Sequence, residues 1–488
     1  MTEVKTSSGF VRGTVVDGVA SFKGVPFAAP PVGDRRFRAP EPPEPWDGVR
    51  EALDYGHTSP QGNYPPPLDR LLANVIIDGD DYLNLNVWTP EAAIGGDPRP
   101  VMVWIHGGAF VNGSGGLYDG TTFARDGVVM VSINYRLGVN GFLWFGEGTP
   151  NLGILDQIAA LRWVRDNVAA FGGDPENVTI FGESAGGMST ATLLAAPAAE
   201  GLFGRAIVQS GGGHVAMSPD AAGRLAHRYA KILGVAPTRE AVAAADPKAI
   251  LAAQSALSVE MNKKPFKRLW GDAAGNLLPF EPVIDGTIVP DLPEKAIAAG
   301  AGAHVGLMVG SNSDEGRLFL APTGTAPKTP PVVPYVYART AGAKKPLATL
   351  KAYRASRPGQ SWGDLTAAFM TDAYFRAPAL RLAEGKPGTY VYEFHWSTPQ
   401  VPGLGACHAL EVPFVFDGLN GSRYDAMTGP SAPQDIATAM HKAWIDFATH
   451  GDPGWPAYDR TTRSTMVFDT TSGVQSDPRP HDRRHWER

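Results

Sequence analysis

Short apolar runs recur along the chain, and most are separated by segments with the spacing of a helix. The runs that are apolar over nearly their whole length are typical of buried strands: residues 83–90, 101–106, 128–135, 178–181, 205–210, 305–310 and 389–396. Two further β-like runs lie near the N-terminus, at 9–16 and 19–23. They precede a proline-rich stretch that we expect to be a loop.

Helical spacing is clearest between residues 154 and 168. Apolar side chains recur there every three or four positions, and the pattern ends at Gly172 and Gly173. A second helix is predicted over residues 189–196, and the chain is expected to close with a third over 435–451.

Strands that alternate with helices predict the α/β class, with a large, mostly parallel central sheet and helices on both faces. The pattern blurs at residues 214–300 and 322–387. We expect these segments to be loop and helical insertions over a site on one core, so that residues 1–488 form a single domain.

Composition excludes several classes of function. The net charge is −6 and the charged fraction is 19%. We find no basic run, so no nucleic-acid partner is expected. Cys407 is the single cysteine, which excludes an internal disulfide and a cysteine-rich metal site. The N-terminus lacks an apolar signal core and no 18-residue apolar run exists, so a cytoplasmic protein without membrane contact is expected.

One serine is crowded by glycines where the strand ending at 181 meets the next helix. Residues 182–186 read Gly-Glu-Ser-Ala-Gly and match G-x-S-x-G. In such a corner, Ser184 would stand clear of the sheet edge, and the helix would aim free N–H groups at it. The pentapeptide alone is equally compatible with a glycine-rich helix start capped by Ser184. The strand before it and the helix after it favour a nucleophile.

A second glycine motif, Trp-Ile-His-Gly-Gly-Ala-Phe, follows the strand at 101–106. Its small residues Gly107, Gly108 and Ala109 would let backbone N–H groups approach a substrate oxygen closely. Acyl transfer needs such donors because its tetrahedral intermediate carries a full charge on that oxygen. A plain glycine turn is the alternative. His106 is expected to brace this loop rather than to act in catalysis.

A serine nucleophile needs a base, and the base needs an orienting acid. His408 lies in a loop after the strand at 389–396, where it can hang over the serine corner. Asp314 and Glu315 both follow the strand at 305–310, so either can supply a carboxylate at the sheet's C-terminal edge. Spacing alone does not choose between them.

Several long segments resemble the type B carboxylesterases, the group that includes bacterial para-nitrobenzyl esterases and animal cholinesterases. They are SFKGVPFAAPPVGDRRFRAPEP, DDYLNLNVWTP, FGGDPENVTIFGESAGG, PVIDG, GSNSDEG, GACHALEVPFVF and FATHGDPGWPAYD, in the family's order. The resemblance implies an α/β-hydrolase fold with Ser184 as nucleophile, His408 as base and Glu315, not Asp314, as the acid. It also implies an oxyanion hole made by the N–H groups of three residues, with Gly107 shaping the loop: Gly108, Ala109 and Ala185.

Less central positions also follow from the resemblance. It implies two ion pairs, Arg36 with Asp80 and Arg136 with Asp156, although each charge taken alone would favour solvated surface. It also places three side chains at the substrate pocket, for which ordinary core packing is the alternative: Phe110, Leu278 and Phe319.

Two positions depart from the family pattern. Ala109 stands where many relatives have glycine, and its methyl group would narrow the loop. Tyr82 replaces a cysteine that forms a disulfide in secreted relatives, in keeping with a bacterial protein in a reducing compartment.

The function that these features predict is a serine carboxylesterase that hydrolyses esters of short to medium acyl chains with aryl or alkyl alcohols. It would need no cofactor and no metal, its partner would be a small ester, and it would be a monomer or a weak oligomer. The alternatives are the same triad acting on amides, carbamates or lactones, and a non-catalytic binding module on this fold.

Overall fold

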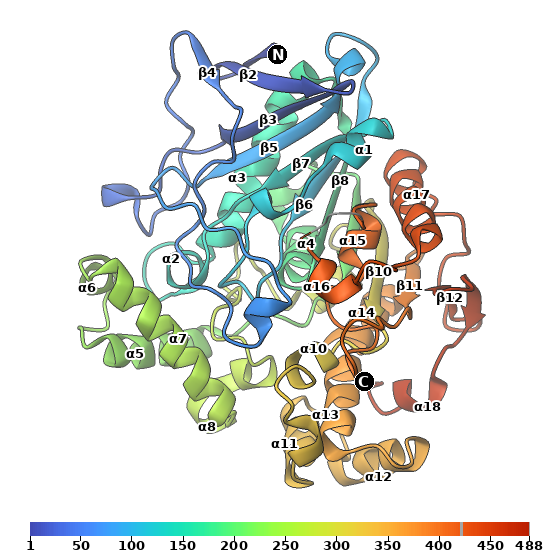
Figure 1. The fold of residues 1–488 in the computed structure, drawn as a ribbon. Helices are drawn as coiled ribbons and strands as arrows, with labels where there is room; N and C mark the ends of the chain where they lie inside the picture. Colours follow the sequence, from blue (N-terminus) through green and yellow to red (C-terminus); the bar gives the residue numbers. More distant parts are fainter. Residues whose placement is uncertain (420–422, 488) are drawn as a thin grey trace.

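The computed structural model describes residues 1–419 and 423–487. Its centre is a 13-stranded sheet with the order β1-β2-β3-β5-β7-β6-β8-β9-β10-β11-β12-β13, and β4 pairs with β2 beside this path (Figure 1). The strands are β1 (Thr2–Thr6), β2 (Gly9–Val16), β3 (Val19–Pro26), β4 (Val49–Glu51), β5 (Asn84–Pro90), β6 (Arg99–Ile105), β7 (Val129–Ile133), β8 (Gly173–Glu183), β9 (Arg205–Gln209), β10 (Gly306–Asn312), β11 (Tyr390–Phe394), β12 (Ser464–Phe468) and β13 (Gly473–Ser476).

The middle of the sheet is parallel and its two ends are antiparallel. Parallel pairs run without interruption from β7 through β6, β8, β9, β10 and β11 to β12. Strands β1, β2, β3 and β5 add antiparallel neighbours at one end, and β13 adds one at the other. The predicted mostly parallel sheet is therefore confirmed.

Alternation along the buried strands divides the interior into two cores. On β6, the side chains of Val101, Val103 and Ile105 join the core under α3 (Leu152–Asn167) and α4 (Ala185–Ala195). Met102 and Trp104 point to the opposite core, under α1 (Thr121–Arg125) and α17 (Gln434–His450). Successive side chains of a strand face opposite sides of the sheet, so helices cover both faces.

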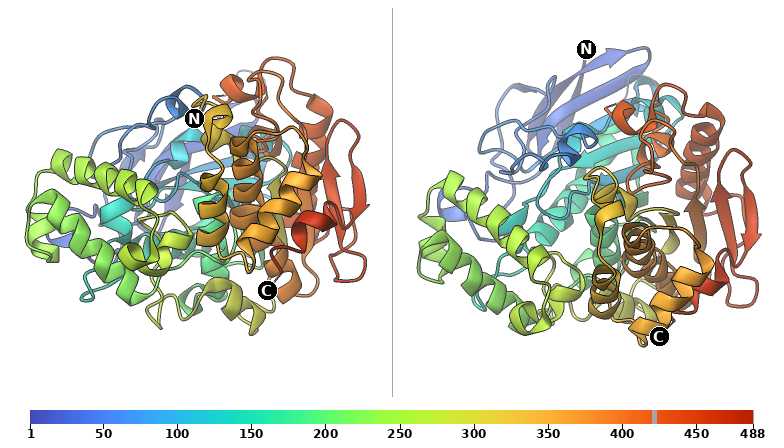
Figure 2. Two further views of the ribbon diagram at one scale, coloured as in Figure 1. Left: turned by 90° about the horizontal axis from the view of Figure 1, so that it is seen from below. Right: turned by 60° about the horizontal axis from the view of Figure 1, so that its bottom comes forward.

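The other helices lie mostly in the two long segments that interrupt the strand pattern. Between β9 and β10 come α5 (Pro219–Leu233), α6 (Arg239–Ala243), α7 (Pro247–Lys263), α8 (Lys267–Trp270) and α9 (Pro293–Ala298). Between β10 and β11 come α10 (Arg317–Leu320), α11 (Val332–Thr340), α12 (Pro346–Ser356), α13 (Trp362–Met370) and α14 (Ala377–Gly385). Helices α5–α8 and α10–α13 lie at the end of the molecule opposite the N-terminal strands (Figures 1 and 2), whereas α9 and α14 pack against each other beside α4 and β10.

The remaining short helices are α2 (Gly138–Phe142), α15 (Val412–Val415), α16 (Asp425–Thr428) and α18 (Pro480–Arg483). In the described residues, no helix has both the length and the apolar character needed to cross a bilayer.

The expectation that the chain closes with the helix at 435–451 is wrong. After α17 the chain forms β12, which joins the parallel sheet beside β11, then β13 and α18. Strand β12 reads Ser-Thr-Met-Val-Phe, which is too short and too mixed for a pattern of apolar positions to single out.

The two predicted ion pairs have different outcomes. Arg136 and Asp156 form a bidentate pair, at 2.8 Å and 2.6 Å, with both side chains almost fully buried. Arg36 instead donates to the Asn140 amide oxygen and to the Ala243 carbonyl, and within the described residues it makes no ion pair with Asp80. The expected Arg36–Asp80 pair is therefore wrong, because a side-chain amide and a main-chain carbonyl satisfy this guanidinium.

Candidate active site

Four loops that follow parallel strands meet at one edge of the sheet. The oxyanion-loop candidate follows β6, Ser184 follows β8, Glu315 follows β10, and His408 lies in the loop after β11. These strands lie within one parallel block, so their carboxyl ends share an edge. Positions more than 300 residues apart in the chain are thereby brought together.

Ser184 occupies the corner between β8 and α4, in a backbone conformation that a serine rarely adopts. Its φ is 56° and its ψ is −122°, and its N–H donates to the Gln209 carbonyl at 3.0 Å. Such strain persists only where the surroundings hold it in place, and it is typical of functional positions. It presents the side chain at the start of α4, where backbone N–H groups are free.

The glycines around Ser184 are required by close backbone packing. A Cβ on Gly186 would lie 1.9 Å from the Ile105 carbonyl oxygen, and one on Gly182 would lie 2.5 Å from the same atom. A Cβ on Gly187 would lie 2.6 Å from the Gln209 carbonyl oxygen. Helix α4 can therefore start directly against β6 and β9 only where these positions lack side chains.

The loop after β6 is also held in an unusual conformation. Gly108 has a φ of 110°, and a Cβ there would lie 2.1 Å from the Asn112 carbonyl oxygen. Ala109 and Phe110 follow with φ values of 55° and 60°, in the left-handed region that costs an L-residue about 1 kcal/mol or more. A Cβ on Gly107 would lie 3.1 Å from Cβ of Ser184, which places the loop beside the serine.

The N–H groups predicted as an oxyanion hole, those of Gly108, Ala109 and Ala185, have no hydrogen-bond acceptor within the described residues. The same is true of the neighbouring N–H groups of Gly107, Phe110 and Gly186. Nearly all backbone N–H groups inside a folded protein are paired, so a group of unpaired donors beside the serine corner is unusual.

His106 supports the loop from beneath, as predicted. Its Nδ1 lies 2.8 Å from the Gly107 carbonyl oxygen, and its ring stacks on Tyr135 with 4.4 Å between the centroids. The Tyr135 hydroxyl donates to the His106 carbonyl at 2.8 Å. Burial lowers the pKa of His106 to about 4, so it stays neutral at physiological pH.

His408 contacts Glu315 and not Asp314. Nδ1 of His408 lies 2.6 Å from Glu315 Oε2, and both side chains are buried. The second oxygen of Glu315 accepts the Asn312 N–H at 2.7 Å. Asp314 turns instead toward Arg317, at 2.9 Å. Glu315 is thus fixed on both oxygens, and it holds the imidazole by Nδ1.

The other imidazole nitrogen faces Glu183, the residue before the serine. Nε2 of His408 lies 3.1 Å from Glu183 Oε1, although the angle does not make a hydrogen bond. In the described part of the chain, no hydrogen bond joins His408 to the Ser184 hydroxyl. Glu183 is buried, and its Oε1 has no hydrogen-bond partner in the described residues.

Buried carboxylates control the protonation of this histidine. Burial lowers the pKa of His408, but Glu183 and then Glu315 outweigh burial and raise it to about 9. Burial raises the pKa of Glu183 to about 8, against the attraction of His408. Groups this close titrate as a unit, and an unperturbed histidine pKa near 6.5 does not apply here.

A third buried carboxyl, Glu411, was missed by the sequence reading. It accepts from the Asn312 amide at 2.6 Å and from the Gln209 amide at 3.4 Å. Gln209 in turn accepts from the Trp444 indole at 2.9 Å. Burial and then Glu315 raise the pKa of Glu411 to about 7. Its position three residues after His408 was the only feature of the sequence that could have indicated it.

The predicted pocket residues lie at different distances from the reaction centre. The Phe319 ring is 5.4 Å from the His408 ring, and Phe375, which the sequence did not indicate, is closer at 4.7 Å. Phe110 is fully buried against Phe142, with 4.8 Å between the ring centroids. Leu278 is partly buried beside the first core.

Two other residues near the serine corner, Cys407 and Ser210, are also buried. Cys407 is fully buried, as expected of a small apolar residue, and burial raises the pKa of its thiol well above the ordinary range. Ser210 is buried at the end of β9, and its hydroxyl has no hydrogen-bond partner in the described residues. No cluster of three or more histidine, cysteine or acidic side chains among those residues is arranged to hold a metal ion.

Comparison with known proteins agrees with this geometry. The carboxylesterase family profile matches residues 1–486. The para-nitrobenzyl esterase of Bacillus subtilis is 39% identical over 99% of this chain and 97% of its own length. The phenmedipham hydrolase of Pseudarthrobacter oxydans is 34% identical over 95% and 94%.

Solved structures give the same result. A para-nitrobenzyl esterase structure superposes with a TM-score of 0.83 at 36% identity, over 99% of both chains. A carboxylesterase of Geobacillus stearothermophilus has a TM-score of 0.86 at 37% identity, over 100% of both chains. The resemblance in the motifs and the predicted fold class are confirmed.

Proposed function

Because the chain belongs to the carboxylesterase family and is a serine carboxylic ester hydrolase, we propose that Ser184, His408 and Glu315 carry out its reaction. The observation that carries the proposal is the strained Ser184 corner beside unpaired backbone N–H groups, with His408 held on Glu315 next to it.

In the first half of the reaction, the Ser184 hydroxyl attacks the ester carbonyl while Nε2 of His408 takes its proton. Glu315 holds Nδ1–H, which fixes the tautomer and stabilises the imidazolium that forms. The carbonyl oxygen, now negative, accepts from the N–H groups of Gly108, Ala109 and Ala185. His408 then returns the proton to the alcohol, which leaves, and water releases the acid by the same route.

The step requires Nε2 to reach the serine hydroxyl, although Glu183 is its neighbour in the resting structure. Glu183 and Ser184 are adjacent in the chain, and the proposal requires a rotation of the imidazole or of the serine side chain that exchanges one partner for the other. Hydrogen bonds of this kind are often long or absent without substrate and form in the complex.

The substrate class within the proposal is carboxylic esters of short to medium acyl chain with aryl or alkyl alcohols. The rings of Phe319 and Phe375 lie beside His408 and offer an apolar surface to one side of the ester. In this tightly turned loop, Ala109 carries a methyl group where glycine would carry only a hydrogen atom. The methyl group therefore limits the space next to the oxyanion donors.

Two measurements on Ser184 test the proposal. Ser184→Ala should abolish hydrolysis of para-nitrophenyl butyrate while circular dichroism and the melting temperature remain those of the wild type. A fluorophosphonate probe should label the wild type once, on the peptide that contains residue 184. The matched control is Ser210→Ala, which removes a neighbouring buried hydroxyl and should leave labelling intact. Turnover by Ser184→Ala, or labelling elsewhere, would refute the assignment.

A further inference from the structure

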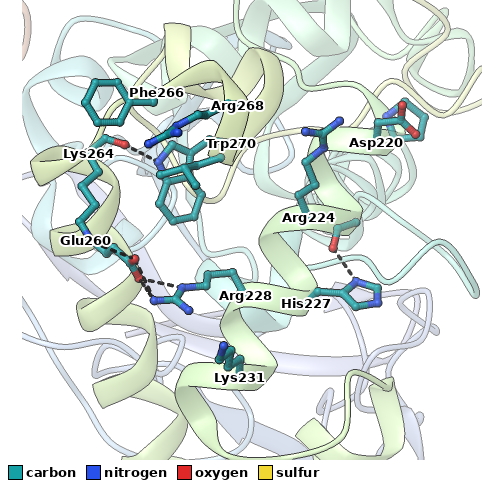
Figure 3. A pocket seen from close by; sticks show the side chains of 13 residues that line it. Asp220, Arg224, His227, Arg228, Lys231, Glu260, Lys264, Phe266, Arg268 and Trp270 are labelled. Carbon is teal, nitrogen blue, oxygen red and sulfur yellow. Dashed lines mark hydrogen bonds and ion pairs between the residues drawn. The ribbon is translucent and has the colours of Figure 1, made fainter.

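A groove outside the serine site separates α5 from the end of α7 and from α8. Its volume is about 1190 Å³, and none of its lining residues belongs to the serine site. Figure 3 shows the side chains of α5 facing those of the segment 260–270 across the groove. Ligand sites of enzymes are concave and commonly of a few hundred to about 1,000 Å³, so the groove is large enough for a small organic molecule.

The lining is strongly cationic. Five arginine or lysine side chains border the groove against two carboxylates, Asp220 and Glu260, which leaves a net charge of +3 in a chain whose total is −6. Residues 263–268 alone carry four cations, so the expectation that the chain has no basic run is wrong. The negative net charge of the whole chain does not show that this region is locally positive.

On α5 the cations form a stripe because of helical spacing. Arg224, Arg228 and Lys231 lie at positions i, i+4 and i+7, which share one face of a helix. The opposite face is buried, with Leu225 and Tyr229 among its apolar members. The basic face is therefore left to the groove rather than to the core.

Three of the groove's cations are not neutralised by the protein. Arg228 is held by Glu260 in three hydrogen bonds of 2.7 to 2.8 Å, and Lys264 lies 3.9 Å from the same carboxylate. Arg224, Lys231 and Arg268 form no hydrogen bond or ion pair within residues 1–419 and 423–487. Both walls thus present unpaired positive charge to the space between them.

The groove also has an apolar end. Phe266 and Leu269 are exposed by 47% and 38% although they are large and apolar, and the Trp270 indole forms part of the wall. Trp270 itself is buried, and its indole N–H is bound to the Lys264 carbonyl at 2.7 Å, so the exposed apolar surface comes from Phe266 and Leu269. Aromatic and apolar surface of this kind stabilises an apolar body by stacking and desolvation.

We propose that this groove binds a soluble organic phosphate, in which a phosphate group is joined to an aromatic or aliphatic body. A phosphate monoester carries close to two negative charges and three acceptor oxygens, which suits several cations on two walls better than a single carboxylate does. Its apolar body fits against Phe266 and Leu269. The concave shape favours a molecule inside the groove over contact with a flat bilayer.

Calorimetric titration with phenyl phosphate at about 50 mM salt, where screening is moderate, tests the proposal. The wild type should bind it saturably, and more tightly than inorganic phosphate, while benzyl alcohol should not bind. The variant Arg224→Gln/Lys231→Gln/Arg268→Gln should bind about tenfold more weakly or worse, since each exposed charge contact contributes a modest factor. Its ester hydrolysis should equal that of the wild type, which shows that it is folded.

The matched control removes the same charge from the same helical region but outside the groove lining: Lys248→Gln/Lys263→Gln/Lys267→Gln. It should retain wild-type affinity for phenyl phosphate. Equal losses in both triple variants would mean a diffuse field without a site and would overturn the proposal. So would the absence of saturable binding by the wild type, or binding only to phosphatidylglycerol vesicles and not to phenyl phosphate.

Discussion

Replacing Glu183 with glutamine removes one carboxylate from beside the His408 imidazole without changing the length of the side chain. Glu183 Oε1 lies 3.1 Å from Nε2 of His408, both groups are buried, and the charge of Glu183 raises the pKa of His408 together with the charge and hydrogen bond of Glu315. A general base works only when neutral, so the pKa of His408 sets the pH above which the enzyme is active.

The size of the effect follows from the same geometry. Raising the pKa of His408 from 6.5 to about 9 corresponds to about 3 kcal/mol in favour of the imidazolium. A full charge at that distance would contribute about 5 kcal/mol at an effective dielectric constant of 20. Glu183 is itself partly protonated because its pKa is raised to about 8, so only part of that interaction operates. We therefore expect Glu183→Gln to lower the apparent pKa by about one to two units.

The assay is kcat/KM for para-nitrophenyl butyrate between pH 5 and 10, which reports ionisation of the free enzyme. The wild-type rate should rise with pH through an apparent pKa well above 6.5. In Glu183→Gln the rise should occur at lower pH, and the plateau should be lower because a charge that stabilises the imidazolium in the transition state is gone. If kcat/KM of the variant rises at the same pH as that of the wild type, the electrostatic argument is refuted.

Asp314→Asn is the matched control for this experiment. It removes the same charge one residue before Glu315, but Asp314 is paired with Arg317, and the pKa of His408 is raised chiefly by Glu183 and Glu315. Its kcat/KM should rise at the same pH as that of the wild type, even if the loop is somewhat destabilised. An equal shift in both variants would show that the net charge of the region, and not the Glu183 contact, moves the profile.

Three further substitutions test the architecture. Gly186→Ala would place a methyl group 1.9 Å from the Ile105 carbonyl oxygen, so we expect little soluble enzyme or a melting temperature lower by several degrees, measured by thermal scanning. Asp156→Asn leaves Arg136 charged and buried without its partner, and should cost about 3–5 kcal/mol in urea unfolding at pH 7; a cost below about 1 kcal/mol would contradict this. Ala109→Gly should raise kcat/KM for bulky-alcohol esters relative to ethyl esters, and an unchanged ratio would show that the methyl group does not border the substrate.

The strongly patterned parts of the fold were predictable from the sequence. Strand β2 was predicted with its observed bounds, Gly9–Val16, and β5 and β9 to within one residue. Strands β5 and β9 are buried along nearly their whole length, whereas β2 alternates between more and less buried positions, and both patterns are typical of strands. Strands β12 and β13 were missed because they lie at one edge of the sheet, where a strand can form without being apolar along its whole length. The Arg36 contact failed for a different reason: its acceptors, the Asn140 amide and the Ala243 carbonyl, are set by packing between distant loops.

The candidate site divides in a similar way. Ser184 and its glycines could be found because a backbone corner constrains the residue types directly, through the close approaches at positions 182, 186 and 187. Spacing left Asp314 and Glu315 equivalent, since adjacent residues share one loop, and only motif resemblance separated them. The placement of Glu183 against Nε2, and of Phe375 beside the imidazole, depends on side-chain rotation and on the fold of inserted helices. No local pattern in the sequence records either.

Surrounding one imidazole with buried carboxyl groups has opposing consequences for catalysis. Each unit by which they raise the pKa of His408 stabilises the imidazolium in the transition state by up to about 1.4 kcal/mol. At a pH below that pKa, each such unit also lowers the fraction of neutral His408 about tenfold. The gain in transition-state stability and the loss of neutral base then cancel. Above the pKa the base is already neutral and the gain is unopposed. With a His408 pKa of about 9, the arrangement of Glu183 and Glu315 therefore favours ester hydrolysis under alkaline conditions, and its advantage over an isolated histidine should vanish toward neutral pH.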